Sequence, residues 1–153
     1  MKQRDLVSMT PGEVSALLYA LRKVQIASLN PDGSVHLVTM FYTVVEEHIA
    51  FWTYRTSQKA RNLARDPRIT CLVEDGEDYF ELRGVQIAGT VRTLTDPDDV
   101  LAIGRLIANG GLKAGDVAGD TLEEYVQHAA RKRYGYIVEP RRVVSWDHRK
   151  LSG

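Results

Sequence analysis

Short β-type runs joined by turn signals make up most of the sequence between residues 24 and 94. The apolar and β-branched runs cover residues 24–29, 35–45, 48–54, 69–74 and 79–94, and a last one covers residues 135–146. Turn formers stand between several of them: Asn30-Pro31-Asp32-Gly33, Glu46-Glu47 and Asp75-Gly76. Connections this short join antiparallel strands, and a small closed barrel removes the exposed edges of such a set. The sequence therefore predicts a mainly β fold with about six antiparallel strands in a small barrel.

Four amphipathic helices are predicted at the periphery of these strands. Thr10, Pro11 and Glu13 form a capping box with proline at the first helical position. Further helices are expected to begin at Ser57, at Asp96 and at Asp120 or Thr121. The third helix is expected to end at Asn109-Gly110-Gly111, and a glycine-containing loop is expected over residues 112–120.

Glycine and proline inside the strand runs predict irregular pairing. Gly84 and Gly89 interrupt the run 79–94, and glycines in strands often mark bulges or bends. Pro140 interrupts the last run, which predicts either an edge strand or a bulge there.

Composition limits the class of protein and of partner. The chain has 153 residues, of which 44% are hydrophobic and 26% charged, and this suits one soluble domain spanning residues 1–153. Lys plus Arg and Asp plus Glu number 20 each, so no overall positive field attracts nucleic acid. No apolar run approaches the roughly 20 residues that span a bilayer, and no signal-peptide pattern is present. We expect a cytoplasmic protein with no membrane partner.

Several familiar chemistries have no sequence support. No glycine-rich Rossmann or Walker loop and no G-x-S-x-G elbow occurs. The four histidines are scattered without a partner at metal-ligand spacing, and no metal is expected. The single cysteine, Cys71, lies inside an apolar run, where a buried thiol is the expected occupant.

The segment 52–67, WTYRTSQKARNLARDP, carries the clearest chemistry. An apolar strand leads into Ser57, a good helix N-cap, and into a short helix with Lys59, Arg61 and Arg65. Free backbone N–H groups, a hydroxyl and flexible cations then gather at one point, as phosphate binding requires. The alternative is an ordinary solvated helix face, which this spacing of cations alone would also produce. The strand-to-helix context favours an anion site.

The motifs around this segment resemble one family. LVTMFYTV, HIAFWTY, KARNL followed by Asp66-Pro67-Arg68, and VEDGEDYFELRGVQIAGTV occur in succession. Together they resemble the split β-barrel proteins of the pyridoxamine 5′-phosphate oxidase-like superfamily, within it the flavin- and deazaflavin-dependent reductases. The resemblance covers about residues 10–110 in its order of elements, and RRVVSWDHRKL near the end is similar to that group as well.

The resemblance implies a six-stranded antiparallel split β-barrel that forms a homodimer. Flavin mononucleotide (FMN) or the 5-deazaflavin coenzyme F420 is then expected in two clefts between the subunits. Cofactor-binding positions carried over from the family, or expected beside them, are Lys59 and Ser57 at the phosphate with Arg55 as a helper, Thr53 beside them, Thr39 and Met40 at the ring, and Trp146 closing the cleft from the partner subunit. Arg61 is a further cation for an anionic tail.

The implied activity is that of a reductase. A hydride passes from the reduced cofactor to an electron-poor double bond of a small organic substrate, so no catalytic triad is needed. The KARNL type of anchor and the nearby cations favour coenzyme F420, with an FMN-dependent oxidoreductase as the alternative. A non-catalytic carrier of a flavin or deazaflavin is a second alternative. No catalytic residue is identified, and Tyr42, Tyr54 and Tyr79 are candidate proton donors. Vitamin B6 oxidation is not expected, because the arginine-rich C-terminal extension of the true oxidases is missing from the sequence.

Overall fold

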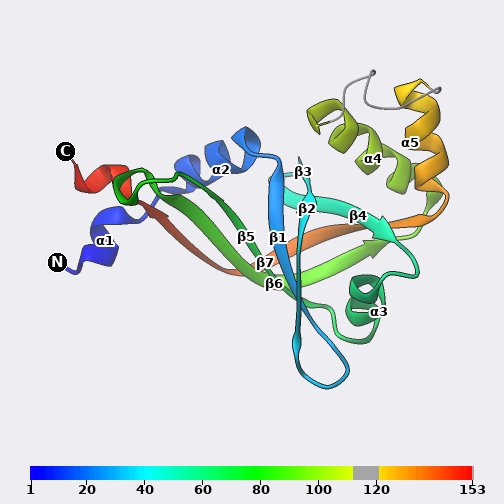
Figure 1. Cartoon of the computed structure of the whole chain (residues 1–153), viewed down its shortest axis with the longest axis horizontal. Helices are drawn as coiled ribbons and strands as arrows, with labels where there is room; N and C mark the ends of the chain where they lie inside the picture. Colours follow the sequence, from blue (N-terminus) through cyan, green and yellow to red (C-terminus); the bar gives the residue numbers. More distant parts are fainter. Residues whose placement is uncertain (112–120, 153) are drawn as a thin grey trace.

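An antiparallel sheet curls around a central core and carries the helices at its periphery (Figure 1). The computed structural model describes residues 1–111 and 121–152. The strands are β1 (Lys23–Leu29), β2 (Val35–Phe41), β3 (Thr43–Val45), β4 (His48–Tyr54), β5 (Arg68–Asp75), β6 (Arg83–Leu94) and β7 (Arg133–Asp147). The helices are α1 (Gln3–Val7), α2 (Pro11–Ala20), α3 (Gln58–Arg65), α4 (Pro97–Gly111) and α5 (Leu122–Ala130), with 3₁₀ turns η1 (Tyr79–Glu81) and η3 (His148–Leu151).

The order of the strands shows why the sheet curls. Hydrogen-bonded neighbours follow the order β2-β1-β5-β6-β7-β4-β3, and every pairing is antiparallel. The two outermost strands, β2 and β3, are consecutive in the chain and separated by Tyr42 alone. Both ends of the sheet must therefore meet at Tyr42. This arrangement is a split barrel, and it confirms the predicted mainly β fold with peripheral helices.

The strand count differs from the prediction, because the sheet has seven strands and not six. The run 35–45 was expected to be continuous, and it breaks at Tyr42. The Tyr42 hydroxyl donates to the carbonyl of Leu18 at 2.5 Å, and its N–H donates to the carbonyl of Arg22 at 3.0 Å. These bonds turn Tyr42 into the interior, where it is buried, and the short β3 is left as a strand of its own.

Alternation along the strands fills the inside of the barrel with apolar side chains. Val24 and Ile26 on β1 and Cys71 and Val73 on β5 are all fully buried. Burying a valine or isoleucine side chain stabilises the fold by about 1.5–3 kcal/mol. The prediction of a buried thiol is confirmed, and burial raises the pKa of Cys71 to about 12.

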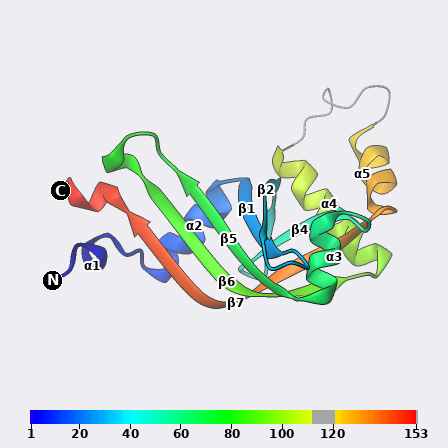
Figure 2. The ribbon, with the colours of Figure 1, turned by 60° about the horizontal axis from the view of Figure 1, so that its bottom comes forward.

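Strands β5, β6 and β7 run side by side as the longest part of the sheet (Figure 2). The β6–β7 register shifts between Ala88 and Gly89, because Ala88 pairs with Arg142 and Gly89 with Pro140. A Cβ at Gly89 would lie 2.1 Å from the Glu139 carbonyl oxygen, so only glycine allows this approach. The predicted bulge is confirmed, and it accommodates Pro140 in an interior strand.

The four predicted helices are present with their caps. Hydroxyls of Thr10, Ser57 and Thr121 accept hydrogen bonds from the N–H three residues on, at 3.1–3.2 Å. Helix α1 was not predicted. Helix α4 includes Asn109-Gly110-Gly111, and the predicted loop 112–120 lies outside the described residues. In the part of the chain that is described, no helix has the length and apolar character needed to cross a bilayer.

Candidate functional site

The end of strand β4 and the start of helix α3 form a small cluster of polar groups. The Ser57 Oγ caps α3 by accepting the Ala60 N–H at 3.1 Å, and the Thr53 Oγ1 lies 3.4 Å from the same oxygen. Thr53 is buried. The first turn of a helix leaves backbone N–H groups without intrahelical acceptors. Two hydroxyls and free N–H groups thus gather at the start of α3, whose first turn also contains Lys59.

Lys59 is half-buried and lines a cavity beside this cluster. Burial lowers the pKa of its ammonium group from the usual value. Within residues 1–111 and 121–152, no carboxylate forms an ion pair with Lys59. A partly desolvated cation without a counter-ion gains from any anion that enters the cavity.

The cavity measures about 330 Å³, which is at the small end of the usual range of about 300–1,000 Å³ for ligand pockets. Strands β2, β4 and β7 and helices α3, α4 and α5 contribute to it. Its lining residues are Met40, Phe41, Trp52, Thr53, Tyr54, Lys59, Gly104, Ile107, Ala108, Tyr125 and Arg133. Two of these side chains are cationic and none is acidic. The cavity is therefore an apolar and aromatic hollow with a positive charge.

Helix α4 forms one wall of the cavity because it packs directly on Trp52. A Cβ at Gly104 would lie 2.2 Å from Cζ3 of the indole, so the ring occupies the space of a side chain. Ile103 and Ile107 of the same helix pack with Ala50 and Ile137 in a second small core. In Figure 1, α4 and α5 lie together at the β4 end of the sheet, opposite the end that carries both termini.

Asn62 fixes helix α3 against the β1–β2 hairpin. Its side chain is fully buried, and its Nδ2 donates to the Ser28 Oγ at 3.2 Å and to the Asn30 Oδ1 at 3.0 Å. Its Oδ1 accepts from Gln58 at 2.9 Å and from Arg65 at 3.3 Å. These bonds satisfy the buried amide and set the position of the helix that carries Lys59.

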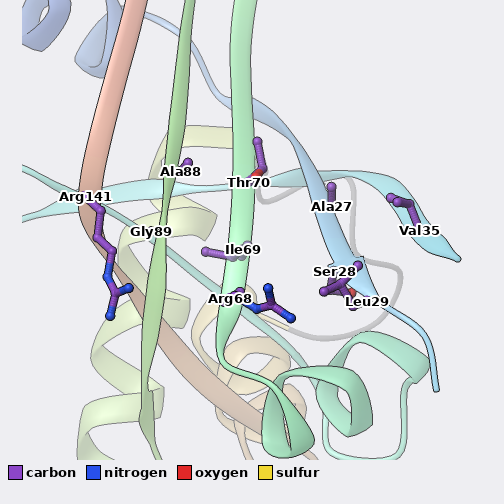
Figure 3. Close-up of a pocket in the computed structure, with 10 residues that line it drawn as sticks. All are labelled: Ala27, Ser28, Leu29, Val35, Arg68, Ile69, Thr70, Ala88, Gly89 and Arg141. Atoms are coloured by element: carbon purple, nitrogen blue, oxygen red, sulfur yellow. The ribbon is translucent and has the colours of Figure 1, made fainter. Parts of the chain in front are cut away.

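A second cavity of about 340 Å³ lies elsewhere, on strands β1, β5 and β6 (Figure 3). Ala27, Thr70 and Ala88 are register partners across these strands, and they face away from the core. Arg68 at its rim forms an ion pair with Asp66 at 2.7 Å. No predicted site residue lines this cavity, so we assign the candidate site to the cavity at Lys59.

Comparison with known proteins identifies the family. The family model described as pyridoxamine 5′-phosphate oxidase matches residues 10–144. The chain belongs to this family. A solved structure of the conserved hypothetical protein Rv2991 from Mycobacterium tuberculosis is 35% identical with a TM-score of 0.88, over 100% of this chain and 94% of that chain. No curated protein matches the sequence significantly.

Two further structures share the split-barrel fold of the pyridoxamine 5′-phosphate oxidase family at low identity. An F420 reductase is 20% identical with a TM-score of 0.64, over 84% of this chain and 94% of that chain. The heme storage protein HutZ from Vibrio cholerae is 11% identical with a TM-score of 0.67, over 88% of this chain and 94% of that chain. These two likenesses show the fold alone.

In this member of the pyridoxamine 5′-phosphate oxidase family, the structure brings four of the predicted site residues together. Met40, Thr53 and Lys59 line one cavity, and Ser57 lies at its edge through its contact with Thr53. Met40 is half-buried, whereas its neighbour Thr39 is exposed on the other face of β2. The alternation expected for this pair is present, and only Met40 lines the cavity.

The other predicted residues lie elsewhere within the chain. Arg55 packs over the Tyr134 ring at 5.1 Å and lines a different hollow. The Arg61 guanidinium donates to the Thr56 carbonyl at 2.8 Å and is exposed. Trp146 lies on β7, and its ring packs over Gly84 of the neighbouring strand β6. A Cβ added at Gly84 would lie only 2.3 Å from this ring. A role for Trp146 in the cleft of a partner subunit stays a prediction.

The three candidate proton donors have different surroundings. The Tyr42 hydroxyl is committed to the Leu18 carbonyl, and burial raises its pKa. Tyr79 lies in η1 beside Phe80 and His148, and it does not line the cavity. Tyr54 lines the cavity and is half exposed. Tyr54 is therefore the candidate whose position fits proton transfer to a ligand there.

Sequence reasoning missed several residues that build the site. Trp52, Gly104, Tyr125 and Arg133 line the cavity, and none was among the predicted site residues. Gly104 did carry a signal, because an isolated glycine inside a helical pattern costs about 1 kcal/mol relative to alanine and points to a packing reason. Arg133 carried no such signal in the sequence. It lies beside Tyr54 because β7 pairs with β4, and this pairing joins distant parts of the chain. Within the described residues no group of three or more His, Cys, Asp or Glu side chains could hold a metal.

Proposed function

We propose that this protein binds a phosphorylated flavin-type cofactor, coenzyme F420, and acts as a reductase. The observation that carries the proposal is the Lys59 ammonium, half-buried and without an ion-pair partner in the described chain, in one cavity with Thr53 and next to the capped start of α3. Family membership supports a cofactor of this type. The F420 reductase of the same fold adds support for the deazaflavin.

The residues present fit such a cofactor. Lys59 neutralises the phosphate, while the Ser57 hydroxyl, which accepts from Thr53, and the free first-turn N–H groups of α3 donate to its oxygens. Met40, Phe41 and Trp52 offer an apolar surface for a flat ring system. The wall formed by α4 limits the access of water from one side, which strengthens the electrostatic attraction between Lys59 and the phosphate.

Apart from the cofactor, the proposed reaction needs only a proton source. When bound, the reduced deazaflavin supplies a hydride, so one carbon of an electron-poor double bond gains a hydrogen with two electrons and the cofactor is left oxidised. The neighbouring atom of the substrate takes a proton from the Tyr54 hydroxyl, which water reprotonates, or from water directly. The proton taken from water is replaced by the one that a neutral reduced deazaflavin releases on oxidation, so atoms and charge balance and the product is the reduced substrate.

We propose in addition that the protein works as a homodimer. Val35 and Leu37 on β2 are exposed by 59% and 64%, and they lie on the sheet face that also carries the groove of Figure 3. Their register partners Leu29 and Ala27 extend the apolar row into β1. A second copy covering this face would remove that surface from water.

Titration of Lys59→Gln with coenzyme F420 and with FMN tests the cofactor proposal. Losing one charged hydrogen bond of about 2 kcal/mol predicts a dissociation constant roughly 30-fold higher, with an unchanged circular dichroism spectrum and melting temperature. Lys2→Gln makes the same substitution at an exposed residue ahead of α1, and it should bind like the wild type. Equal affinities for Lys59→Gln and the wild type would refute the phosphate site.

Measurements on the wild-type protein distinguish an F420-dependent reductase, an FMN-dependent oxidoreductase and a non-catalytic carrier. Tighter binding of coenzyme F420 than of FMN supports the deazaflavin, and the reverse order supports the FMN-dependent oxidoreductase. Starting from the reduced cofactor, the return of the oxidised cofactor's absorbance band when an enone or nitroimidazole acceptor is added supports catalysis. Tight binding of a cofactor without turnover of any acceptor supports the carrier.

A further inference from the structure

Arg133 brings a second positive charge to the cavity from a different element. It is the first residue of β7 and pairs with Tyr54 of β4. Its guanidinium carbon lies 4.0 Å from the centroid of the Tyr54 ring and 5.0 Å from that of Trp52. The two aromatic rings hold the guanidinium plane in place, which reduces the conformational entropy lost when it binds a ligand.

The hydrogen bonds of Arg133 leave one edge of the guanidinium for a ligand. Nη1 donates to the Ala129 carbonyl at 2.9 Å, at the end of α5. In the described part of the chain, Nε and Nη2 have no hydrogen-bond acceptor, and no carboxylate forms an ion pair with Arg133. Nε and Nη2 form the side edge of the fork, whose two parallel N–H groups match the two oxygens of a carboxylate.

We propose that Arg133 forms a carboxylate-binding subsite in the cavity, separate from the phosphate site at Lys59. The aromatic residues Trp52, Tyr54 and Tyr125 surround this subsite and exclude a strongly hydrated ion in favour of a carboxylate on an organic molecule. The carboxylate can belong to the anionic tail of the cofactor or to the organic substrate. The cofactor source rests on the proposed function, whereas the substrate source does not require it.

The first experiment compares two cofactors in the Arg133→Gln variant. Coenzyme F420 carries carboxylates and FMN carries none, while both carry a phosphate. If the subsite holds the cofactor, Arg133→Gln should weaken coenzyme F420 at least tenfold and FMN less than threefold. Arg133→Lys keeps the charge without the planar fork and should recover part of the affinity. Arg131→Gln removes an exposed neighbouring charge and serves as the matched control.

The second experiment uses benzoate and its neutral isostere benzamide, with the Nε–H resonance of Arg133 followed by NMR. If the subsite holds a substrate carboxylate, benzoate should shift this resonance with saturation at millimolar concentration, both without and with FMN, and benzamide should not. Saturable binding of benzoate should be lost in Arg133→Gln and kept in Arg131→Gln. The melting temperatures of the variants, measured alongside, identify any general loss of the fold.

The outcomes of the two experiments are distinct. Selective loss of coenzyme F420 affinity assigns the subsite to the cofactor, and loss of benzoate binding with unchanged cofactor affinities assigns it to the substrate. If the wild type binds neither cofactor, the proposed function fails and the benzoate arm still decides the subsite. Equal loss of both cofactors in Arg133→Gln, with no benzoate effect, would show a structural role for Arg133 and overturn the inference.

Discussion

The indole of Trp52 occupies the space that a side chain at Gly104 would need, with Cζ3 only 2.2 Å from the position of a Cβ. Trp52 lies on β4 and Gly104 on α4, so this contact sets how closely the helix approaches the sheet. It thereby also sets the width of the cavity that both residues line.

Gly104→Ala should therefore destabilise the protein although alanine favours helices. Overpacking of this kind costs about 1–3 kcal/mol, which outweighs a gain of about 1 kcal/mol in helix propensity. Gly110→Ala is the matched control, because it lies on the same helix and, among the described residues outside its own helix backbone, no atom lies within 4 Å of the new Cβ. Urea unfolding should show a lower midpoint for Gly104→Ala and an unchanged or higher one for Gly110→Ala. Equal midpoints would contradict the packing described.

Asn62→Ala should loosen helix α3 from the hairpin. The substitution leaves the buried Ser28 hydroxyl without its donor and removes the bond to Asn30. We expect a loss of about 2–3 kcal/mol in the free energy of unfolding and a weaker cofactor affinity, since α3 carries Lys59. Gln58→Ala removes one bond to the Asn62 Oδ1 and should cost less than 1 kcal/mol. Chemical denaturation measures both effects, and similar losses in the two variants would argue against the buried amide as the anchor.

We expect the folded protein to lose stability in acid because of Asp147. Hydrogen bonds from the Arg149 side chain, at 2.7 and 2.9 Å, hold the pKa of this buried carboxyl below its usual value of 3.8. A pKa lowered by folding contributes stability above the unfolded value, and this contribution is lost as pH falls through the folded pKa. Because Arg149 is half exposed, we expect only about 1 kcal/mol from the pair.

The matched variant for this prediction is Asp147→Asn, which keeps a side-chain oxygen for the Arg149 N–H. Its free energy of unfolding should be lower than that of the wild type at pH 6. The difference should begin to shrink below about pH 4, where the unfolded chain takes up a proton at this carboxyl, and it should be lost once the folded carboxyl is protonated as well. A difference that stays constant down to pH 2 would exclude the charge as its source.

Leu37→Glu tests the face assigned to the second copy. A charge placed on this apolar row should prevent association, so the variant should sediment as a monomer of about 17.2 kDa while the wild type sediments at twice that mass. Leu106→Glu places the same charge on an exposed leucine of α4 and should leave the dimer intact. A monomeric wild type at micromolar concentration, or a dimeric Leu37→Glu, would rule out this interface.

Local patterns in the sequence were enough to predict most of the strand segments, four helices and the β6–β7 bulge, but not the separate strand β3. Caps such as Thr10 and Ser57 act within three residues, and strand alternation acts within two, so short windows contain the necessary information. The strand-to-helix junction at Ser57 and Lys59 was predicted for the same reason. Helix α1, of only five residues, has no capping side chain and no sequence signal of that kind.

Other features depend on contacts between distant residues. The break at Tyr42 needs the carbonyl of Leu18, which is 24 positions away, and the anchoring of Asn62 needs Ser28, which is 34 positions away. Arg133 reaches the cavity because β7 pairs with β4, and its register partner Tyr54 lies about half the chain length away. Such placements follow from the order of strands in the sheet, and this order cannot be inferred from composition or local spacing.

Tyr42 joins the two edges of the sheet through the polypeptide backbone. Because β2 and β3 meet through this one residue, the two margins of the sheet are held together by peptide bonds instead of a ladder of interstrand hydrogen bonds. A circular permutant with new termini at this position would keep every strand pairing and yet lose the link that turns the sheet into a ring. The wall that carries Met40 would then be free to swing away from the one that carries Trp52.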